Sequence, residues 1–297
     1  MLRRCFLMLA LWLGAMAPAH AEAYRLGIVC KSLDGEYWGT VSRAAKREAQ
    51  RQGVTIMLRA PERESDTATQ IRAVEQLIAQ RVDGIALAPV DSKALGPVVK
   101  KAVRAGIKVV TFDTDTVDKD RLTYIGTDNL AAGRKAGEEL LGLRSEGKVA
   151  IVTGVSTAQN LRQRVEGFRR AMLGTRIRLL SEQADQGQRE TAVRIAQETL
   201  AAHPDLGAFF ADNAIAGPAI AEVVRQSGRP VSVVAFDATP TMLKLVRSGT
   251  VQVVIAQKPE QMGKLGVKTL VQALKGQPIP PLIPTEVEVI SAASLKR

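Results

Sequence analysis

Short apolar segments alternate with longer amphipathic segments along most of the chain. Between the apolar segments, residues such as Ile71, Val74 and Ile78 recur at helical spacing. Continuous apolar strands separated by helices are typical of parallel sheets covered on both faces, so we predict a doubly wound α/β protein. The segments predicted as strands are RLGIVC (25–30), VTIMLR (54–59), DGIALAPV (83–90), IKVVTF (107–112), KVAIVT (148–153), RIRLLS (176–181), GAFFA (207–211), VSVVAF (231–236) and VQVVIA (251–256).

The predicted strands fall into two groups, within residues 25–125 and 148–256. The chain is longer than one hydrophobic core comfortably serves, and both groups follow the same strand–helix–strand plan. We therefore expect two lobes. Ligands of open α/β sheets bind outside the carboxyl ends of the strands, so two lobes that face each other across those ends would form a binding cleft.

Residues 1–21 have the order of a secretory signal peptide. Arg3 and Arg4 precede an apolar run over 6–16, and the segment ends in Ala19-His20-Ala21, which fits an A-x-A cleavage site. The run is well short of the roughly 20 apolar residues that span a bilayer. We favour a cleaved signal peptide over a retained membrane anchor, and we expect an exported chain.

The composition excludes several classes of site. Beyond the predicted leader there is one Cys (Cys30) and one His (His203), too few for an intramolecular disulfide or a His/Cys zinc site. His203 precedes a proline between a predicted helix and strand, so we interpret it as a turn residue rather than a member of a catalytic triad. We expect no metal and no cofactor.

The whole chain carries a net charge of +11, which first suggests nucleic acid as a partner. However, the basic residues are spread over amphipathic helices and interleaved with Glu and Gln, as in SRAAKREAQRQG. No recognition-helix signature or aromatic–basic pattern accompanies them. We therefore predict a solvated basic surface and no nucleic-acid partner.

Polar and aromatic residues follow the ends of the predicted strands. Carboxylates and amides accept hydrogen bonds from hydroxyl groups, Arg and Asn donate, and an aromatic ring stacks on C–H surface. No nucleophile–base pair is among them, so we expect a polyhydroxylated neutral ligand. The candidates are Lys31, Tyr37, Trp38, Asp113, Thr114, Asp115, Asn160, Arg164, Asn213, Asp237 and Gln257.

Seven motifs resemble, in this order, those of periplasmic solute-binding proteins of the ribose-binding type, which capture sugars for ABC importers. The resemblance covers the chain after the leader and implies the type I periplasmic binding protein fold, with two Rossmann-like lobes joined by a three-strand hinge. It also implies a monomer in the periplasm that delivers sugar by hinge closure to an ABC permease with its ATPase. The motifs are IVCKSLDGEYW, VVTFDTDT, YIGTDNLAAGRKAG, NLRQRVEGF, AFFADN, VVAFDATP and VVIAQKPEQMG.

The resemblance also implies lobe boundaries and roles for residues. One lobe would comprise residues 24–127 and 258–286, and the other 128–257 and 287–297, with hinge crossings near 127–128, 257–258 and 286–287. Tyr37 and Trp38 would form an aromatic wall. The hydrogen-bonding positions would be Asp113, Arg164, Asn213, Asp237 and Gln257.

Three departures from the ribose-type pattern put ribose itself in doubt. Thr114, followed by the second carboxylate Asp115, stands where ribose-type sites have an Arg. No aromatic residue occurs near Gln186, and Lys31 replaces a small polar residue. We expect a one-sided aromatic wall and a pairing of Lys31 with Asp113 or Asp115. The ligand is left open between a sugar, a polyol and a furanosyl signalling molecule.

Two other functions compete with sugar delivery to a permease. KVVTFDTDTV fits the D-x-D-x-T signature of haloacid-dehalogenase phosphatases, with Asp113 as nucleophile and Asp115 as general acid beside Mg²⁺. That motif normally opens its domain, whereas here it follows three strand–helix units, which disfavours the enzyme. The second alternative is sensory, with the closed form presented to a chemoreceptor or a sensor kinase, and the sequence leaves it open. LacI-type repressors share the fold, but a signal peptide stands here in place of their DNA-binding segment.

Overall fold

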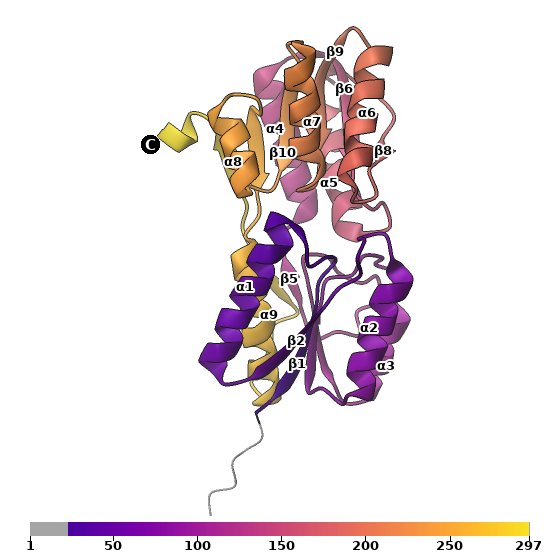
Figure 1. The fold of residues 1–297 in the computed structure, drawn as a ribbon, viewed down its shortest axis with the longest axis vertical. Coiled ribbons are helices and arrows are strands. Elements are labelled where there is room, and N and C mark those ends of the chain that lie inside the picture. Colours follow the sequence, from indigo (N-terminus) through magenta and orange to yellow (C-terminus); the bar gives the residue numbers. More distant parts are fainter. Residues whose placement is uncertain (1–22, 297) are drawn as a thin grey trace, which may run out of the picture.

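The computed structural model describes residues 23–296, so the predicted leader lies outside the described residues. The described chain forms two lobes stacked along the long axis of the molecule, each built on one sheet with helices on both faces (Figure 1). Within this part of the chain, no helix is long and apolar enough to cross a membrane.

The lower lobe contains a fully parallel sheet with the strand order β12-β5-β4-β3-β1-β2. The helices α1 (Gly35–Gln52) and α9 (Pro259–Leu274) cover one face, and α2 (Thr67–Ala79) and α3 (Gly96–Arg104) cover the other (Figure 1). The strands are β1 (Arg25–Val29), β2 (Thr55–Arg59), β3 (Gly84–Leu87), β4 (Lys108–Phe112), β5 (Tyr124–Gly126) and β12 (Leu282–Pro284).

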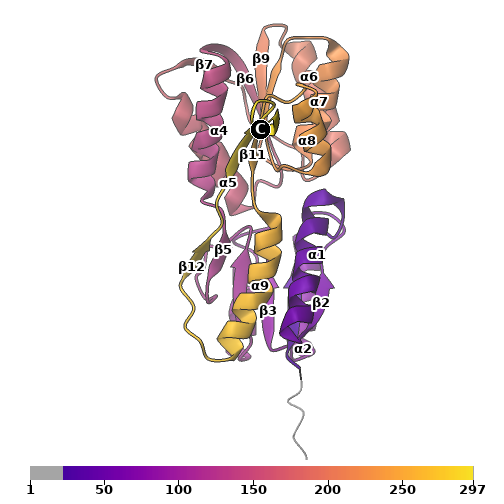
Figure 2. The same cartoon turned by 90° about the vertical axis from the view of Figure 1, so that its left-hand side faces the viewer.

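The upper lobe has the strand order β13-β11-β10-β9-β6-β7, with the short β8 (Gln183–Ala184) paired to β6. Only β13 runs antiparallel to its neighbour within the described sheet. The other strands of the upper lobe, besides β8, are β6 (Glu146–Thr153), β7 (Arg176–Leu179), β9 (Leu206–Ala211), β10 (Ser232–Phe236), β11 (Val253–Ala256) and β13 (Glu288–Ser291). Figure 2 shows α4 (Asn129–Leu143) and α5 (Gln159–Met172) on one face, and α6 (Arg189–Ala202), α7 (Ala216–Ser227) and α8 (Pro240–Arg247) on the other.

The chain passes between the lobes three times. It rises from β5 into α4, returns from β11 into α9, and rises again from β12 to β13 (Figure 2). Each lobe is therefore discontinuous in sequence, and residues more than 100 positions apart can meet between the lobes.

The predicted α/β class is confirmed, and each of the nine predicted apolar segments overlaps a strand. The strands β5, β8, β12 and β13 were not among the predicted segments. They have three, two, three and four residues. Runs of two or three residues carry no readable hydrophobic period.

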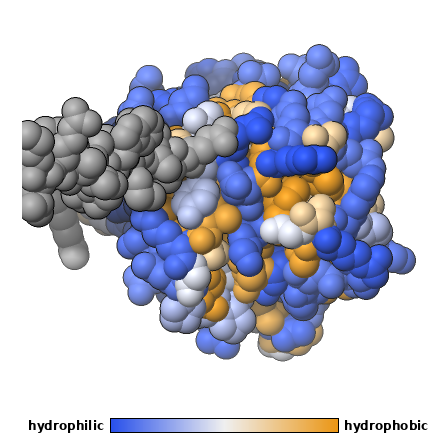
Figure 3. Space-filling view, turned by 90° about the horizontal axis from the view of Figure 1, so that it is seen from below, coloured by the Kyte–Doolittle hydropathy of each residue, from blue (hydrophilic) through white to orange (hydrophobic). Residues whose placement is uncertain are grey.

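Apolar side chains from the strands fill the space between the sheets and helices. In the upper lobe the rings of Phe168 and Phe210 stack with centroids 4.0 Å apart. The end of the lower lobe, seen from below, shows hydrophilic side chains around smaller groups of apolar ones, as expected for the outside of such layers (Figure 3).

Two glycines let α4 and α5 approach until their backbones touch. A Cβ atom on Gly133 would collide with the carbonyl oxygen of Arg164, and one on Gly167 would collide with the carbonyl oxygen of Leu130. This close packing brings Asn129 at the start of α4 within hydrogen-bond distance of the Arg164 side chain on α5. The helix pair therefore fixes one of the predicted site residues.

Replacing Gly167 with Ala is expected to lower the free energy of unfolding by about 1–3 kcal/mol or more, because the added methyl group meets backbone that cannot move aside. The matched control is Gly142→Ala, also on α4–α5, where nothing lies within 4 Å of the new Cβ. That control should be neutral or slightly stabilising, since Ala favours helix. Urea unfolding of both variants measures the difference, and equal effects would contradict the packing argument.

Candidate functional site

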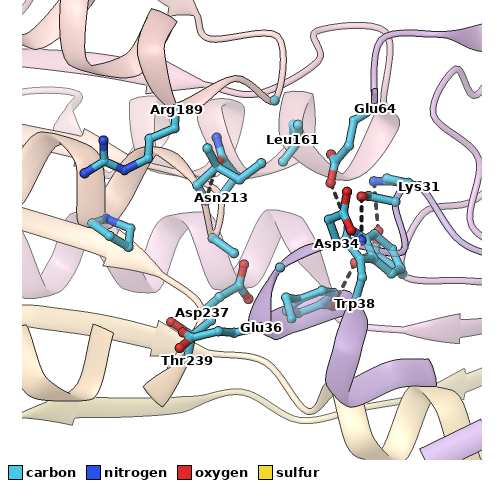
Figure 4. Close-up of a pocket in the computed structure, with 18 of the residues that line it drawn as sticks. Lys31, Asp34, Glu36, Trp38, Glu64, Leu161, Arg189, Asn213, Asp237 and Thr239 are labelled. Atoms are coloured by element: carbon cyan, nitrogen blue, oxygen red, sulfur yellow. Dashed lines mark hydrogen bonds and ion pairs between the residues drawn. The ribbon is translucent and has the colours of Figure 1, made fainter. Parts of the chain in front are cut away.

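A cavity of about 470 Å³ lies between the lobes, at the carboxyl ends of strands from both sheets. In Figure 4, Lys31, Trp38 and Glu64 lie on one side of it and face Arg189, Asn213 and Asp237 on the other. Nine of the predicted site residues line the cavity: Lys31, Tyr37, Trp38, Asp113, Asn160, Arg164, Asn213, Asp237 and Gln257.

Asp113 is the most heavily bonded carboxylate of the cavity. It follows β4 in the left-handed region, with φ +60°, a conformation that non-glycine residues seldom adopt. Its Oδ2 is 2.8 Å from the ammonium of Lys31 and accepts from Thr114 Oγ1 at 3.0 Å, and its Oδ1 accepts from the Tyr37 hydroxyl at 2.9 Å. Burial opposes ionisation, but the nearby cations outweigh it and lower the pKa of Asp113.

Asn160 joins this cluster from the other lobe. Its Oδ1 accepts from Lys31 Nζ at 3.3 Å, and its Nδ2 donates to Asp113 Oδ2 at 3.3 Å. The amide thus contacts both members of a buried ion pair that belongs to the lower lobe. These contacts link the two lobes across the cavity.

Arg164 enters the cavity from α5 with only 1% of its surface exposed. Its Nε donates to Asn129 Oδ1 at 2.9 Å, its Nη1 donates to the carbonyl of Asp212 at 2.8 Å, and the guanidinium lies 4.4 Å from the centre of the Phe236 ring. Its Nη2 is buried and has no acceptor among the described residues. A rigidly held guanidinium beside the cavity therefore keeps one donor nitrogen without a protein partner.

Asp237 occupies in the upper lobe the place that Asp113 has in the lower one. It follows β10 with φ +71°, and its Oδ1 accepts from Gln257 Nε2 at 2.8 Å. Burial raises its pKa to about 6, against the opposing effect of Arg164. Gln257 in turn accepts from Thr127 at 3.2 Å, so the Asp237 carboxyl is tied to two of the strand-to-helix crossings between the lobes.

Asn213 lines the cavity but also has a local structural role. Its Oδ1 accepts from the backbone amides of Ile215 and Ala216 at the start of α7, both at 2.9 Å, and its Nδ2 donates to Asp185 at 3.1 Å. The side chain is therefore fixed by the helix that it caps.

The aromatic wall consists of Tyr37 and Trp38 in the first turn of α1. Their rings meet edge to face, 5.1 Å apart, and both are 6% exposed. No other aromatic residue of the described chain lines the cavity, and the apolar residues that line it from the upper lobe are not aromatic: Leu161, Ala214, Ile215 and Pro218. Gly187, next to Gln186, lies in the wall instead of an aromatic side chain.

Thr114 and Asp115 do not line the cavity. The Thr114 hydroxyl is bonded to Asp113, while Asp115 turns away to an ion pair with Arg121 at 2.8 Å and another with Lys119 at 2.6 Å. Lys31 therefore pairs with Asp113 and not with Asp115, and the second carboxylate of the D-x-D-x-T motif lies outside the site.

Glu64 was not predicted and is part of the cavity wall. Its Oε1 accepts from the indole nitrogen of Trp38 at 2.7 Å, and burial raises its pKa although Lys31 and Trp38 oppose the shift. Glu64 follows β2, so the same argument from strand ends could have found it. The loop from Glu62 to Glu64 contains no motif, so the sequence patterns did not indicate it as part of the site.

Comparisons with known proteins identify relatives over most of the chain. A family model described as periplasmic binding protein domain matches residues 26–278. The D-ribose/D-allose-binding protein of Pseudomonas aeruginosa is 33% identical over 88% of this chain and 86% of that protein, and the ribose import binding protein of Haemophilus influenzae is 29% identical over 95% and 97%. An ABC transporter solute-binding protein of Agrobacterium vitis, solved with bound D-fucose, is 29% identical with a TM-score of 0.90, over 92% of this chain and 97% of that one.

The raised pKa of Asp237 predicts a contribution to the pH dependence of stability. Between its ordinary pKa of 3.8 and about 6, the folded chain holds a proton that the unfolded chain has released. The free energy of unfolding should therefore fall as pH rises through this window, by at most about 1.4 kcal/mol per pH unit from this group. Asp237→Asn keeps the shape, tolerates positive φ and should lack this slope. Urea unfolding from about pH 4 to about pH 6 measures both proteins, and parallel curves would refute the assignment.

Proposed function

Because the chain belongs to the periplasmic binding protein family, we propose that it captures a neutral sugar or a closely related polyol between its lobes and delivers it to an ABC importer. The relatives named for ribose and allose, and the relative solved with D-fucose, support a carbohydrate ligand. Lys31 and Gly187 stand at positions where the chain departs from the ribose-type pattern. We therefore propose a class of ligand and no particular sugar.

The observation that carries this proposal is the buried guanidinium of Arg164. Three neighbours fix its plane, and its buried Nη2 has no acceptor among the described residues, although Arg164 lines the cavity. A hydroxyl or ring oxygen of a sugar would meet that requirement, while the faces of Tyr37 and Trp38 would pack against its C–H surface.

The charges around the cavity support a neutral ligand rather than an anion. Six carboxylates and four cations line it, and the two most buried cations each have a carboxylate partner or neighbour. Lys31 is paired with Asp113, and the charge of Arg164 acts on Asp237. An anionic ligand would meet no excess of positive charge there.

We propose that binding proceeds by hinge closure at the three crossings, near residues 127–128, 257–258 and 286–287. The lobes would then comprise residues 24–127 with 258–286, and 128–257 with 287–297. Ligand contacts on both lobes would stabilise the closed form by their differential affinity for it. The hydrogen bonds of Asn160 with Lys31 and Asp113 are among those that opening would break.

A phosphatase function finds little support in the site. Asp115, the would-be general acid, lies outside the cavity in ion pairs with Lys119 and Arg121. Among the described residues, no group of three or more His, Cys, Asp or Glu side chains is placed to hold a metal ion. The family model is described as a periplasmic binding protein domain, and the relatives include ribose import binding proteins, so we propose binding without turnover here.

We place the protein in the periplasm, exported by its predicted signal peptide, as a monomer whose closed form docks on a permease. The import binding proteins among its relatives support a permease over a chemoreceptor or sensor kinase. Co-purification of the sugar-loaded chain with an ABC permease would support this choice, and capture of a sensor kinase would overturn it.

A panel of D-ribose, D-allose, D-fucose and sugar alcohols is expected to contain a compound that raises the melting temperature by mass action. The same compound should change the fluorescence of Trp38, the only Trp outside the predicted leader, because its ring lines the cavity. Differential scanning fluorimetry and emission spectra test both effects. Stabilisation by phosphorylated sugars alone would contradict a neutral ligand.

Arg164→Ala is expected to weaken binding of the best compound by about 2 kcal/mol, roughly thirtyfold in Kd, because it removes a buried hydrogen-bonded charge. Arg162→Ala, an exposed position on the same helix, is the control and should leave Kd unchanged. Isothermal titration calorimetry measures both, with Arg164→Lys as a second variant if the Ala variant unfolds. An unchanged Kd in a folded Arg164 variant would remove this residue from the site.

A further inference from the structure

The helix α5 begins without a capping side chain of its own. Its N-cap residue is Ala158, which has the extended backbone of an N-cap, φ −78° and ψ 125°, but no oxygen to offer the free amides of the first turn. Ser, Thr, Asp or Asn normally fills this position. The first turn of α5 matters because it carries Asn160 and Leu161, and Arg164 follows one turn later.

The missing cap is supplied by the opposite lobe. The hydroxyl oxygen of Ser92, between β3 and α3, accepts from the backbone amide of Gln159 at 2.8 Å, and Ser92 is fully buried. The backbone amide of Ser92 donates to the carbonyl of Thr157 at 3.2 Å, and the Thr157 hydroxyl donates to the carbonyl of Val90 at 3.2 Å. A row of hydrogen bonds thus joins the lower lobe to the residues that lead into α5.

A second helix end is also bonded across the cleft, although α8 has a cap of its own in Thr239. Glu36 of α1 accepts from the backbone amide of Thr241 at 3.0 Å and from its hydroxyl at 2.8 Å, at the first turn of α8. A carboxylate at a helix N-terminus interacts favourably with the helix dipole. Figures 1 and 2 both show the start of α1 beneath α8.

We propose that Ser92 is a positioning residue for the ligand site: by capping α5 across the cleft, it makes the placement of Asn160 in the first turn of that helix depend on closure. This inference rests on the proposed hinge closure. When the lobes separate, the Gln159 amide exchanges Ser92 for water and the first turn of α5 loosens. When they close, the turn is fixed, and the Asn160 side chain meets Lys31 and Asp113. Glu36 acts in the same sense on α8.

Amide hydrogen exchange at the first turn of α5 tests the proposal. Ser92→Ala removes the cap, whereas Thr157→Val removes a neighbouring hydrogen bond between the lobes and leaves the cap in place. We expect Ser92→Ala to speed exchange of the Gln159 amide roughly two- to thirtyfold, the range for loss of a helix cap, and Thr157→Val to change it much less. Exchange is followed by NMR without ligand and with saturating D-allose, and small-angle scattering reports the closure of each variant.

Glu36→Gln provides an independent second variant. It should speed exchange of the Thr241 amide and leave that of Gln159 unchanged. Unchanged exchange at Gln159 in Ser92→Ala, with and without D-allose, would overturn the proposal, as would an equal effect of Thr157→Val. Calorimetry of the unmodified chain with D-allose and the sugar panel tests the proposed function independently of the exchange measurements. If no carbohydrate binds the unmodified chain while the difference in exchange persists, the proposed function fails and the cap stands.

Discussion

The buried ion pair between Lys31 and Asp113 is the interaction on which the cleft depends. Two charges removed from water are costly unless their remaining hydrogen-bonding groups are satisfied. Here Tyr37 and Thr114 donate to the carboxylate, and Asn160 bonds both partners from the other lobe. The pair therefore stabilises the fold only as part of a network that extends over both lobes. The arrangement of this wall of the cavity depends on the contact between the lobes.

The two lobes share one backbone arrangement beside the cavity, an aspartate with positive φ directly after a strand. Asp113 and Asp237 each end a strand in the left-handed region, and each donates its backbone amide at 3.0 Å to an isoleucine of the neighbouring strand. Two residues beyond those isoleucines stand Thr127 and Gln257, which bond to one another at 3.2 Å. Backbone strain of this kind persists only where its surroundings enforce it, and it clusters at functional sites.

Much of the fold and of the cavity could be predicted from sequence, because apolar runs mark strands and parallel strands gather the residues that follow them at one edge. Tyr37, Asp113 and Asp237 were found in this way. Glu64 obeys the same rule but stands in a loop without a motif. The role of Ser92 could not be predicted, since its partner amide belongs to a helix 67 positions away on the other lobe. Asp115 points away from the cavity because it pairs with Arg121, and only the folded loop brings these two residues together.

The mirrored aspartates also bear on how such a site could change its ligand over evolutionary time. Asn is the residue that best replaces an Asp at positive φ, so these two positions offer few routes of variation. Glu64 and the aliphatic wall at Leu161, Ala214 and Ile215 carry no such backbone constraint. New specificities are therefore more accessible through the walls than through the two aspartates, and a library for redesign would diversify the walls and leave the strand ends untouched.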